Sequence, residues 1–229
     1  MTILLLETAT QICSAAVEHD GKVVAERHSD EPNAHSSRLA VFIDELLKEP
    51  DIAAHGLDAV CVSSGPGSYT GLRIGVSSAK GLCYALDIPL LSVPTLQNMA
   101  SQYFSLHTDY QGLVCPMIDA RRMECYTAFY DRNGEMRATA AEVIEAGLYD
   151  RWLDAGLVTF IGDGAAKTMP LLAAHPNARF DTSFRIAAGG MTLLAERKLH
   201  DGDHEDVAYF EPFYLKDFVA KKSVVHGLR

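Results

Sequence analysis

Apolar and polar positions along the first thirty residues fall into short runs that predict strands. Apolar runs of strand length occupy residues 3–7, 13–19 and 22–29. Asp20-Gly21 separates the second run from the third. Asp-Gly between two apolar runs predicts a tight hairpin, because both central residues of a type I′ turn need positive φ. The chain is therefore expected to begin with three strands, two of which form a hairpin.

The next seventy residues change from a helical period to a strand period and back. In residues 34–48, apolar side chains recur at spacings of three and four, which predicts a helix with one buried face. The elements expected after it are a continuous apolar strand at 57–64, a helix over 70–86, a strand over 89–93 and a helix that begins at Thr95.

The second half of the chain repeats this order. The expected elements are strands at 112–119 and 124–130, a hairpin turn at Asn133-Gly134, a helix over 141–155, a strand over 157–162 and helices over 165–174 and 187–200. Two halves with one order of elements predict a duplicated α/β unit. We expect a first lobe of residues 1–107 and a second lobe of residues 108–229, with the boundary in the polar stretch 105–112.

Composition and charge narrow the class of protein. A chain of 229 residues with 48% hydrophobic content can bury roughly 70% of its unfolded surface, so it needs no disulfide or metal to fold. A net charge of −10 argues against a broad contact with nucleic acid. The five cysteines show no CxxC spacing and are expected to act as small apolar residues in a reducing cytoplasm. The N-terminal apolar run ends at Glu7, so it predicts neither a signal peptide nor a membrane span.

Residues 63–82, with the sequence SSGPGSYTGLRIGVSSAKGL, are rich in glycine and lie between a predicted strand and a predicted helix. Such a junction can bind an anion. The stretch nevertheless lacks the Gly-Lys-Ser/Thr ending of a P-loop, and its glycines are spaced one residue too widely for a dinucleotide fingerprint. Tyr69 stands where a nucleophile elbow needs serine. Ser68 or Thr70 is therefore expected to cap the helix.

One side of this predicted helix is nearly bare of large side chains. Small or apolar residues recur along it at helical spacing: Gly71, Leu72, Gly75, Ser78, Ala79 and Leu82. A glycine inside a helix costs roughly 1 kcal/mol relative to alanine, so its use needs a reason. Two reasons fit equally well, namely close packing on the chain's own sheet and close approach of another protein's helix.

Several stretches together resemble a known family. Residues 65–96 (GPGSYTGLRIGVSSAKGLCYALDIPLLSVPTL) resemble the signature of the TsaB (YeaZ) family, and further similar stretches are ILLLETATQICSAAV at 3–17, HSSRL at 35–39, IDARRMECYTAFY at 118–130, IGDGA at 161–165 and EPFYLKDFVAKK at 211–222. The resemblance covers nearly the whole chain. It implies an α/β fold of the actin-like, sugar-kinase-like ATPase type (ribonuclease H-like) with two duplicated lobes.

Two departures from the catalytic relatives bear on activity. TsaD enzymes of the wider family carry His-x-x-x-His after the strand that follows the glycine-rich helix, a spacing suited to a metal ion. Thr95 and Met99 occupy these positions here, as an expected helix N-cap and as part of an apolar helix face. Active members also use an aspartate in the opening strand, where this chain has Glu7. Glu7 could reach a cation, but a local pairing is favoured because one carboxylate makes a poor metal site.

The resemblance implies a non-catalytic subunit, with no catalytic residue and no metal site of its own. Its expected role is to support a TsaD-like enzyme in transferring a threonylcarbamoyl group to adenosine in tRNAs that read codons beginning with adenine. The expected partners are that enzyme, a TsaE-like ATPase and a second copy of the chain, with tRNA reached only through the complex. We expect no cofactor on the chain alone, although a nucleotide could lie at a partner interface.

The surface predicted to bind these partners is the small-residue helix face Gly71, Leu72, Gly75, Ser78, Ala79 and Leu82. Two other functions remain open at this point. One is a stand-alone ATP-dependent kinase of a small molecule with the same fold. The other is a glycoprotease-type peptidase, for which the sequence offers neither a metal pair nor a Ser/His/Asp elbow.

Three polar clusters have no assigned role from sequence. His200 and His204 lie among four acidic residues in HDGDHED, where Asp201-Gly202 favours a solvated turn over a metal site. Residues 119–124 combine two acidic and two basic side chains, which could pair with one another or face a partner. The locally basic C-terminal stretch contains Lys216, Lys221, Lys222 and Arg229, a tail that could approach RNA inside a complex.

Overall fold

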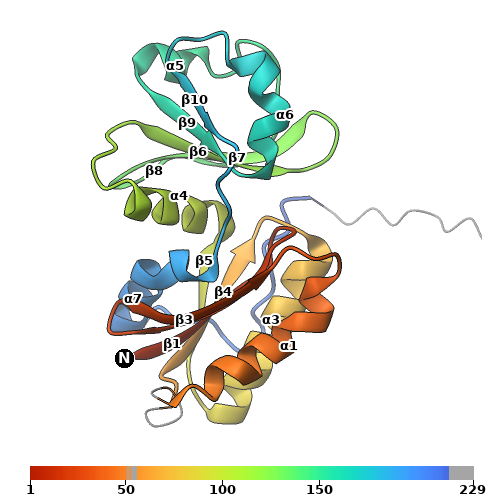
Figure 1. Ribbon diagram of the computed structural model, residues 1–229, viewed down its shortest axis with the longest axis vertical. Helices are drawn as coiled ribbons and strands as arrows, with labels where there is room; N and C mark the ends of the chain where they lie inside the picture. Colours follow the sequence, from red (N-terminus) through yellow and green to blue (C-terminus); the bar gives the residue numbers. More distant parts are fainter. Residues whose placement is uncertain (51, 53–55, 217–229) are drawn as a thin grey trace, which may run out of the picture.

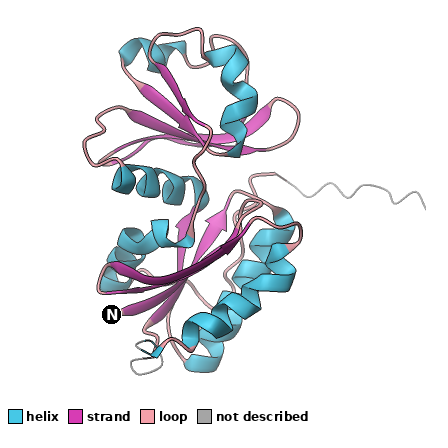
Figure 2. Ribbon diagram, in the orientation of Figure 1, coloured by secondary structure: helices cyan, strands magenta, loops and turns pink. Residues whose placement is uncertain are grey.

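Two five-stranded mixed sheets, one above the other in Figure 1, form the centres of two α/β lobes. The computed structural model describes residues 1–50, 52 and 56–216. Figure 2 shows helices on both faces of each sheet. No helix among the described residues combines the length and the apolar character needed to cross a membrane.

The first sheet has the strand order β3-β2-β1-β4-β5. Its strands are β1 (Thr2–Glu7), β2 (Cys13–His19), β3 (Lys22–Ser29), β4 (Ala59–Gly65) and β5 (Leu90–Pro94). The first three strands are antiparallel neighbours, and β4 and β5 add to β1 in parallel. The predicted hairpin at Asp20-Gly21 is confirmed, since both residues have positive φ.

Every residue of β1 is buried because helices cover both faces of the first sheet. Leu4 and Leu6 point into a cluster under α1 (Ala34–Leu47) and α3 (Tyr69–Leu86). Ile3 and Leu5 point to the opposite side, where a 3-10 turn, η1 (Ala188–Met191), and α7 (Thr192–Asp201) pack. Burial on both faces explains why this strand is a continuous apolar run rather than an alternating one.

The second sheet has the order β10-β9-β6-β7-β8. Its strands are β6 (Leu113–Asp119), β7 (Glu124–Asp131), β8 (Gly134–Val143), β9 (Val158–Ile161) and β10 (Ala178–Asp181). Helix α4 (Thr95–Leu106) covers the face toward the first lobe, and α5 (Asp150–Ala155) and α6 (Asp163–Leu172) cover the other. Since both sheets place their strands in the same spatial order, the predicted duplication is confirmed.

Two elements of the second lobe differ from the sequence prediction. The expected helix over 141–155 is wrong in its first part, because Ala141 and Val143 continue β8 and pair with Tyr126 and Glu124 of β7. Only Asp150–Ala155 is helical. Strand β10 was not predicted: it is four residues long, too short for a pattern, and its parallel pairing with β9 defines it.

Within the described part, the chain crosses between the lobes twice. It leaves the first lobe before β6 and returns after β10, so Met191 and Ala195 pack against the first sheet with Leu91 and Val93. Residues 188–201, which form η1 and α7, therefore add to the first lobe in space. The division of the chain into residues 1–107 and 108–229 remains a prediction about domains.

The glycine-rich helix α3 turns its bare side toward its own chain. A Cβ added to Gly71 would overlap the carbonyl oxygen of Thr8, and one added to Gly75 would overlap the hydroxyl of Thr8. Ala79, farther along the same side, is also buried. The helix begins as predicted, with the Ser68 hydroxyl accepting a hydrogen bond from the Gly71 N–H at 3.2 Å. Of the two reasons for the small residues, the structure supports packing on the chain's own fold.

The same substitution at two glycines of α3 should therefore have opposite effects on stability. Gly71→Ala should lower the free energy of unfolding by about 1–3 kcal/mol, because the new methyl group meets the backbone of Thr8. Gly81→Ala should raise it by roughly 0.5–1 kcal/mol, because nothing lies within 4 Å of a Cβ there and alanine favours the helix. Urea denaturation measures both. Equal effects at the two positions would contradict this account of the bare side.

Candidate functional site

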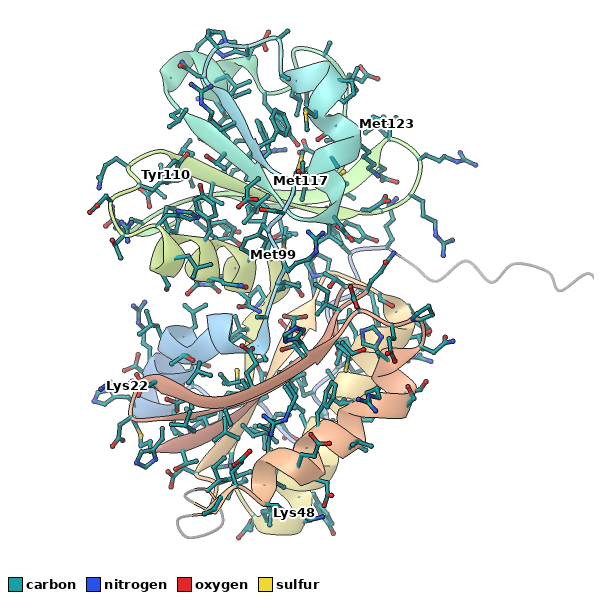
Figure 3. All side chains as sticks on the ribbon, in the orientation of Figure 1. Lys22, Lys48, Met99, Tyr110, Met117 and Met123 are labelled. Carbon is teal, nitrogen blue, oxygen red and sulfur yellow. The ribbon has the colours of Figure 1, made fainter. Side chains whose placement is uncertain are left out.

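The candidate site lies between the lobes, where the C-terminal end of β1 meets the N-terminal half of α4. Glu7 ends β1 and is fully buried. Asn98, one turn into α4, is buried as well. In Figure 3, Met99 of the same helix marks this region between the two sheets. The two positions singled out from sequence, the opening-strand carboxylate and the start of α4, are thus brought together.

The carboxylate of Glu7 is fully engaged by its own chain. Its Oε1 accepts hydrogen bonds from the N–H of Ala9 at 2.8 Å and from the hydroxyl of Ser63 at 2.9 Å. Its Oε2 accepts from the Nδ2 of Asn98 at 2.8 Å. Asn98 also donates to the carbonyl of Ala187 at 3.3 Å. Glu7 therefore pairs locally, as favoured from sequence, and it links β1, β4, α4 and the second crossover between the lobes.

Burial controls the protonation of Glu7. Loss of solvent raises the pKa of its carboxyl to about 7 from the usual 4.5, while the hydrogen bonds from Ala9, Asn98 and Ser63 act in the opposite direction. Glu18, on the same sheet, is also raised to a pKa of about 7 by burial. A buried carboxyl with this pKa carries a proton for part of the time near neutral pH.

The start of α4 offers no metal ligand. Thr95 is the first residue of the helix and Pro94 holds the N-cap position, so the expected capping role of Thr95 is wrong. A capping residue must lie outside the helix for its oxygen to reach the free N–H groups, and the buried hydroxyl of Thr95 has no hydrogen-bond partner. Met99 packs in the core as expected, with its Cε against Gly162 of the second lobe.

The turn between β6 and β7, residues 120–123, is held in place by a lysine of helix α6. Lys167 of α6 donates to the carboxylate of Asp119, to the carbonyl of Arg122 at 2.9 Å and to the carbonyl of Glu124 at 2.7 Å. Asp163 accepts from the N–H of Asp119 at 2.9 Å, and burial raises its pKa. An ammonium group thus fills the position where these oxygens converge. Nothing in the sequence pattern singled out Lys167, since it lies some forty residues away.

The two arginines of this turn do not pair with its acidic residues. Asp119 pairs with Lys167, and Glu124 forms an ion pair with Lys216. Arg121 and Arg122 have φ of 74° and 52°, a left-handed conformation that is costly for side chains other than glycine. Both guanidinium groups are left exposed. The alternatives left open for residues 119–124 are therefore resolved for the acids, which form ion pairs outside the turn.

These residues do not fit a metal-bound nucleotide. Both oxygens of Glu7 already accept protein hydrogen bonds, and the oxygens around Asp119 surround an ammonium. Within residues 1–50, 52 and 56–216, no three His, Cys, Asp or Glu side chains gather as a metal site would need. The five cysteines are buried and unpaired, and burial raises the pKa of the Cys13, Cys83 and Cys125 thiols to about 11.

Four of the six residues predicted to form a partner surface face the interior. Gly71, Leu72, Gly75 and Ala79 are buried, for the packing reason given above. Ser78 and Leu82 are half-buried and lie beside exposed positions of α3. In this structure a partner could contact only these two of the six, together with the outer side of the helix.

The acidic C-terminal cluster forms a turn, as favoured from sequence. Gly202 caps α7 with φ of 69°, which places His200 inside the helix and His204 after it. Glu205 accepts a hydrogen bond from Ser92 at 2.5 Å, and Asp206 accepts from the N–H of Ala208 at 2.8 Å. The acidic side chains therefore stabilise the C-terminal segment. Lys221, Lys222 and Arg229 lie outside the described residues.

Sequence comparisons match this chain to one family. The family model described as TsaD, tRNA N6-adenosine threonylcarbamoyltransferase, matches residues 23–147, which is more than half of the chain. A relative from Bacillus subtilis (strain 168), named tRNA threonylcarbamoyladenosine biosynthesis protein TsaB, is 39% identical over 135 residues. That match covers 58% of this chain and 57% of the relative, so it spans little over half of the relative's length. The TsaB relative from Escherichia coli (strain K12) is 28% identical over 235 residues, covering 98% of both.

Solved structures are also similar to this chain. YeaZ from Pseudomonas aeruginosa superposes with a TM-score of 0.77 at 29% identity, covering 93% of this chain and 99% of that chain. The activator of 2-hydroxyisocaproyl-CoA dehydratase from Clostridium difficile, solved with bound ADPNP, has a TM-score of 0.53 at 10% identity, covering 90% and 99%. At that identity the second likeness shows the fold alone.

The paired lobes and these neighbours define the class as the actin-like, sugar-kinase-like ATPase fold, which confirms the predicted fold. Within that class, the chain belongs to the TsaD family. The resemblance to TsaB and YeaZ that residues 65–96 predict is confirmed as well.

Glu7 should make the stability of the chain depend on pH. Between pH 4.5 and 7 the folded chain keeps a proton on Glu7 that the unfolded chain releases, so the free energy of unfolding falls as pH rises through this window. Glu7→Gln removes this contribution, and its stability should fall less steeply, with a slope difference of at most roughly 1.4 kcal/mol per pH unit. Urea denaturation between pH 4.5 and 8 measures the slopes.

Glu31→Gln is the matched control, because Glu31 is exposed and should leave the wild-type slope unchanged. Glu18 remains in every variant and contributes the same background decline. Identical slopes for wild type and Glu7→Gln would show that Glu7 does not titrate in this window.

Proposed function

We propose that this chain is the non-catalytic subunit that supports a TsaD-like enzyme. The enzyme would transfer a threonylcarbamoyl group from threonylcarbamoyl-AMP to adenosine in tRNAs that read codons beginning with adenine. The names of the TsaB relatives and of the matching family model support a role in this modification. The chain would act in the cytoplasm and reach tRNA only through the complex.

The observation that supports the non-catalytic role is that the residues between the lobes are engaged in hydrogen bonds and packing within the chain. Glu7 stands where the active relatives have the opening-strand aspartate. Both of its carboxylate oxygens accept hydrogen bonds, from Ala9, Ser63 and Asn98. Thr95 and Met99 offer no imidazole, and Met99 is needed for packing against Gly162. Groups that hold the fold together in this way are not free to bind a metal ion.

The proposed contact surface is the outer side of α3, continued onto α1. These two helices pack against each other on one face of the first sheet (Figure 1). Tyr84 and Leu86 near the end of α3 are 85% and 50% exposed, and Val41 of α1 is 41% exposed. Gly81 leaves open space beside them, and Ser78 and Leu82 lie at the margin. Small exposed residues beside large apolar ones suit the close approach of a partner helix.

A TsaD-like enzyme is the first partner we propose for this surface, and a second copy of the chain would compete for it. A TsaE-like ATPase would join the assembly as a third member. The chain alone would bind no cofactor, and a nucleotide would lie where the subunits meet. The contribution of the chain would be to stabilise the active conformation of its partner.

Gly81→Glu tests this surface without disturbing the fold. The side chain would extend into open space and favour the helix, so the variant should stay folded while its bulk and charge abolish co-purification with the TsaD-like protein of the same organism. Mass spectrometry of tRNA nucleosides from the reconstituted system should show at least about a tenfold loss of threonylcarbamoyladenosine, since that loss corresponds to about 1.4 kcal/mol of binding.

Ala155→Glu is the matched control, because Ala155 is an exposed residue at the end of α5 in the second lobe. It should co-purify and support modification as the wild type does. Undiminished binding by Gly81→Glu would reject the proposed surface. Full modification in reactions that omit the chain would reject the proposed function itself.

A further inference from the structure

The C-terminal segment Glu205–Lys216 runs along the first lobe without forming a helix or a strand of a sheet. It begins at the open edge of the first sheet, where the N–H of Glu205 donates to the carbonyl of Leu90 at 2.8 Å. It passes the glycine-rich loop, where the N–H of Phe213 donates to the carbonyl of Ser64 at 2.7 Å. The segment thus satisfies backbone groups that the ends of β4 and β5 would otherwise expose.

Helix α3 binds the middle of this segment through hydrogen bonds. The ammonium of Lys80 donates to the carbonyls of Ala208 and Phe210, at 3.2 and 2.9 Å. One ammonium that binds two carbonyl oxygens uses charge-assisted hydrogen bonds, which are stronger than neutral ones. Farther along, the Tyr214 ring lies 4.9 Å from the Tyr69 ring at the start of α3. The segment is therefore attached to α3 at two positions, at Tyr69 where the helix begins and at Lys80 in its C-terminal half.

The last described residue of the segment contacts the other lobe. Lys216 forms an ion pair with Glu124, which follows the β6–β7 turn. The carbonyl of Glu124 accepts from the N–H of Ala120 at 3.0 Å, and its N–H donates to the carbonyl of Arg121 at 3.1 Å. Glu124 therefore closes the turn that carries the two exposed arginines, and its side chain receives the C-terminal segment.

We propose that Glu205–Lys216 is an interlobe latch that couples helix α3 to the β6–β7 turn. Lys216 lies only two residues after Tyr214, which contacts Tyr69 of α3, and two residues span at most about 7 Å. With so little slack, a shift of α3 against the segment moves or breaks the contact at Glu124. The geometry of the turn, and with it the direction of Arg121 and Arg122, thus depends on the state of α3. This inference concerns the chain alone and stands apart from the proposed function.

A change on the first lobe with a readout on the second tests the latch. Lys80→Met keeps the aliphatic stem and removes the ammonium that holds two carbonyls. Hydrogen exchange should become about two- to fivefold faster at the amides of Ala120 and Glu124, the range expected from losing an exposed ion pair. Lys48→Met is the control, because Lys48, the C-cap residue of α1, pairs with Asp44 of that helix. It should leave both amides unchanged.

The ion pair itself is tested by reversing its charges. Lys216→Glu and Glu124→Lys should each speed exchange at Ala120, and the double variant should restore the wild-type rate. This pair of changes also serves if Lys80→Met does not fold. Faster exchange in residues 205–216 with an unchanged turn would overturn the proposal, because the segment would then be docked on the first lobe alone. Failure of the double variant to restore the rate would overturn it as well.

Discussion

The buried carboxyl of Glu7 is the interaction on which the arrangement of the two lobes depends. It ends the central strand of the first sheet and accepts hydrogen bonds from β4 through Ser63 and from α4 through Asn98. Asn98 continues the network to Ala187, where the chain returns from the second lobe. Since burying a carboxyl is costly unless its hydrogen bonds are satisfied, any change in the placement of α4 disturbs the first sheet.

The same position illustrates how one fold can serve chemistry in one protein and structure in another. A carboxylate that positions a cation needs an open coordination side, whereas the oxygens of Glu7 are used within the chain. Lys167 has a parallel effect in the second lobe, where its ammonium satisfies Asp119 and two carbonyls. In both lobes these polar groups thus find their partners within the chain, in agreement with the supporting role that we propose.

The sequence was sufficient for most of the fold, because strands buried on both faces form unmistakable apolar runs and Asp20-Gly21 marks its hairpin. It was insufficient for β8, an edge strand whose half-exposed residues carry no alternation, and for the four-residue β10. At the candidate site, the sequence was sufficient to single out Glu7 as the carboxylate of the opening strand. Asn98 and Lys167 were not, because their partners lie far away in sequence and only the folded chain brings them together.

The small-residue side of α3 shows why the sequence pattern alone did not distinguish packing on the chain's own fold from contact with a partner helix. Gly71 and Gly75 satisfy a steric requirement that either an internal strand or an external helix would impose, and spacing does not distinguish the two. The carbonyl oxygen and the hydroxyl of Thr8, directly after Glu7, take that space. The glycines therefore let α3 lie directly against the start of the loop after β1. What is left for other molecules is the opposite side of α3, whose position the inward packing fixes.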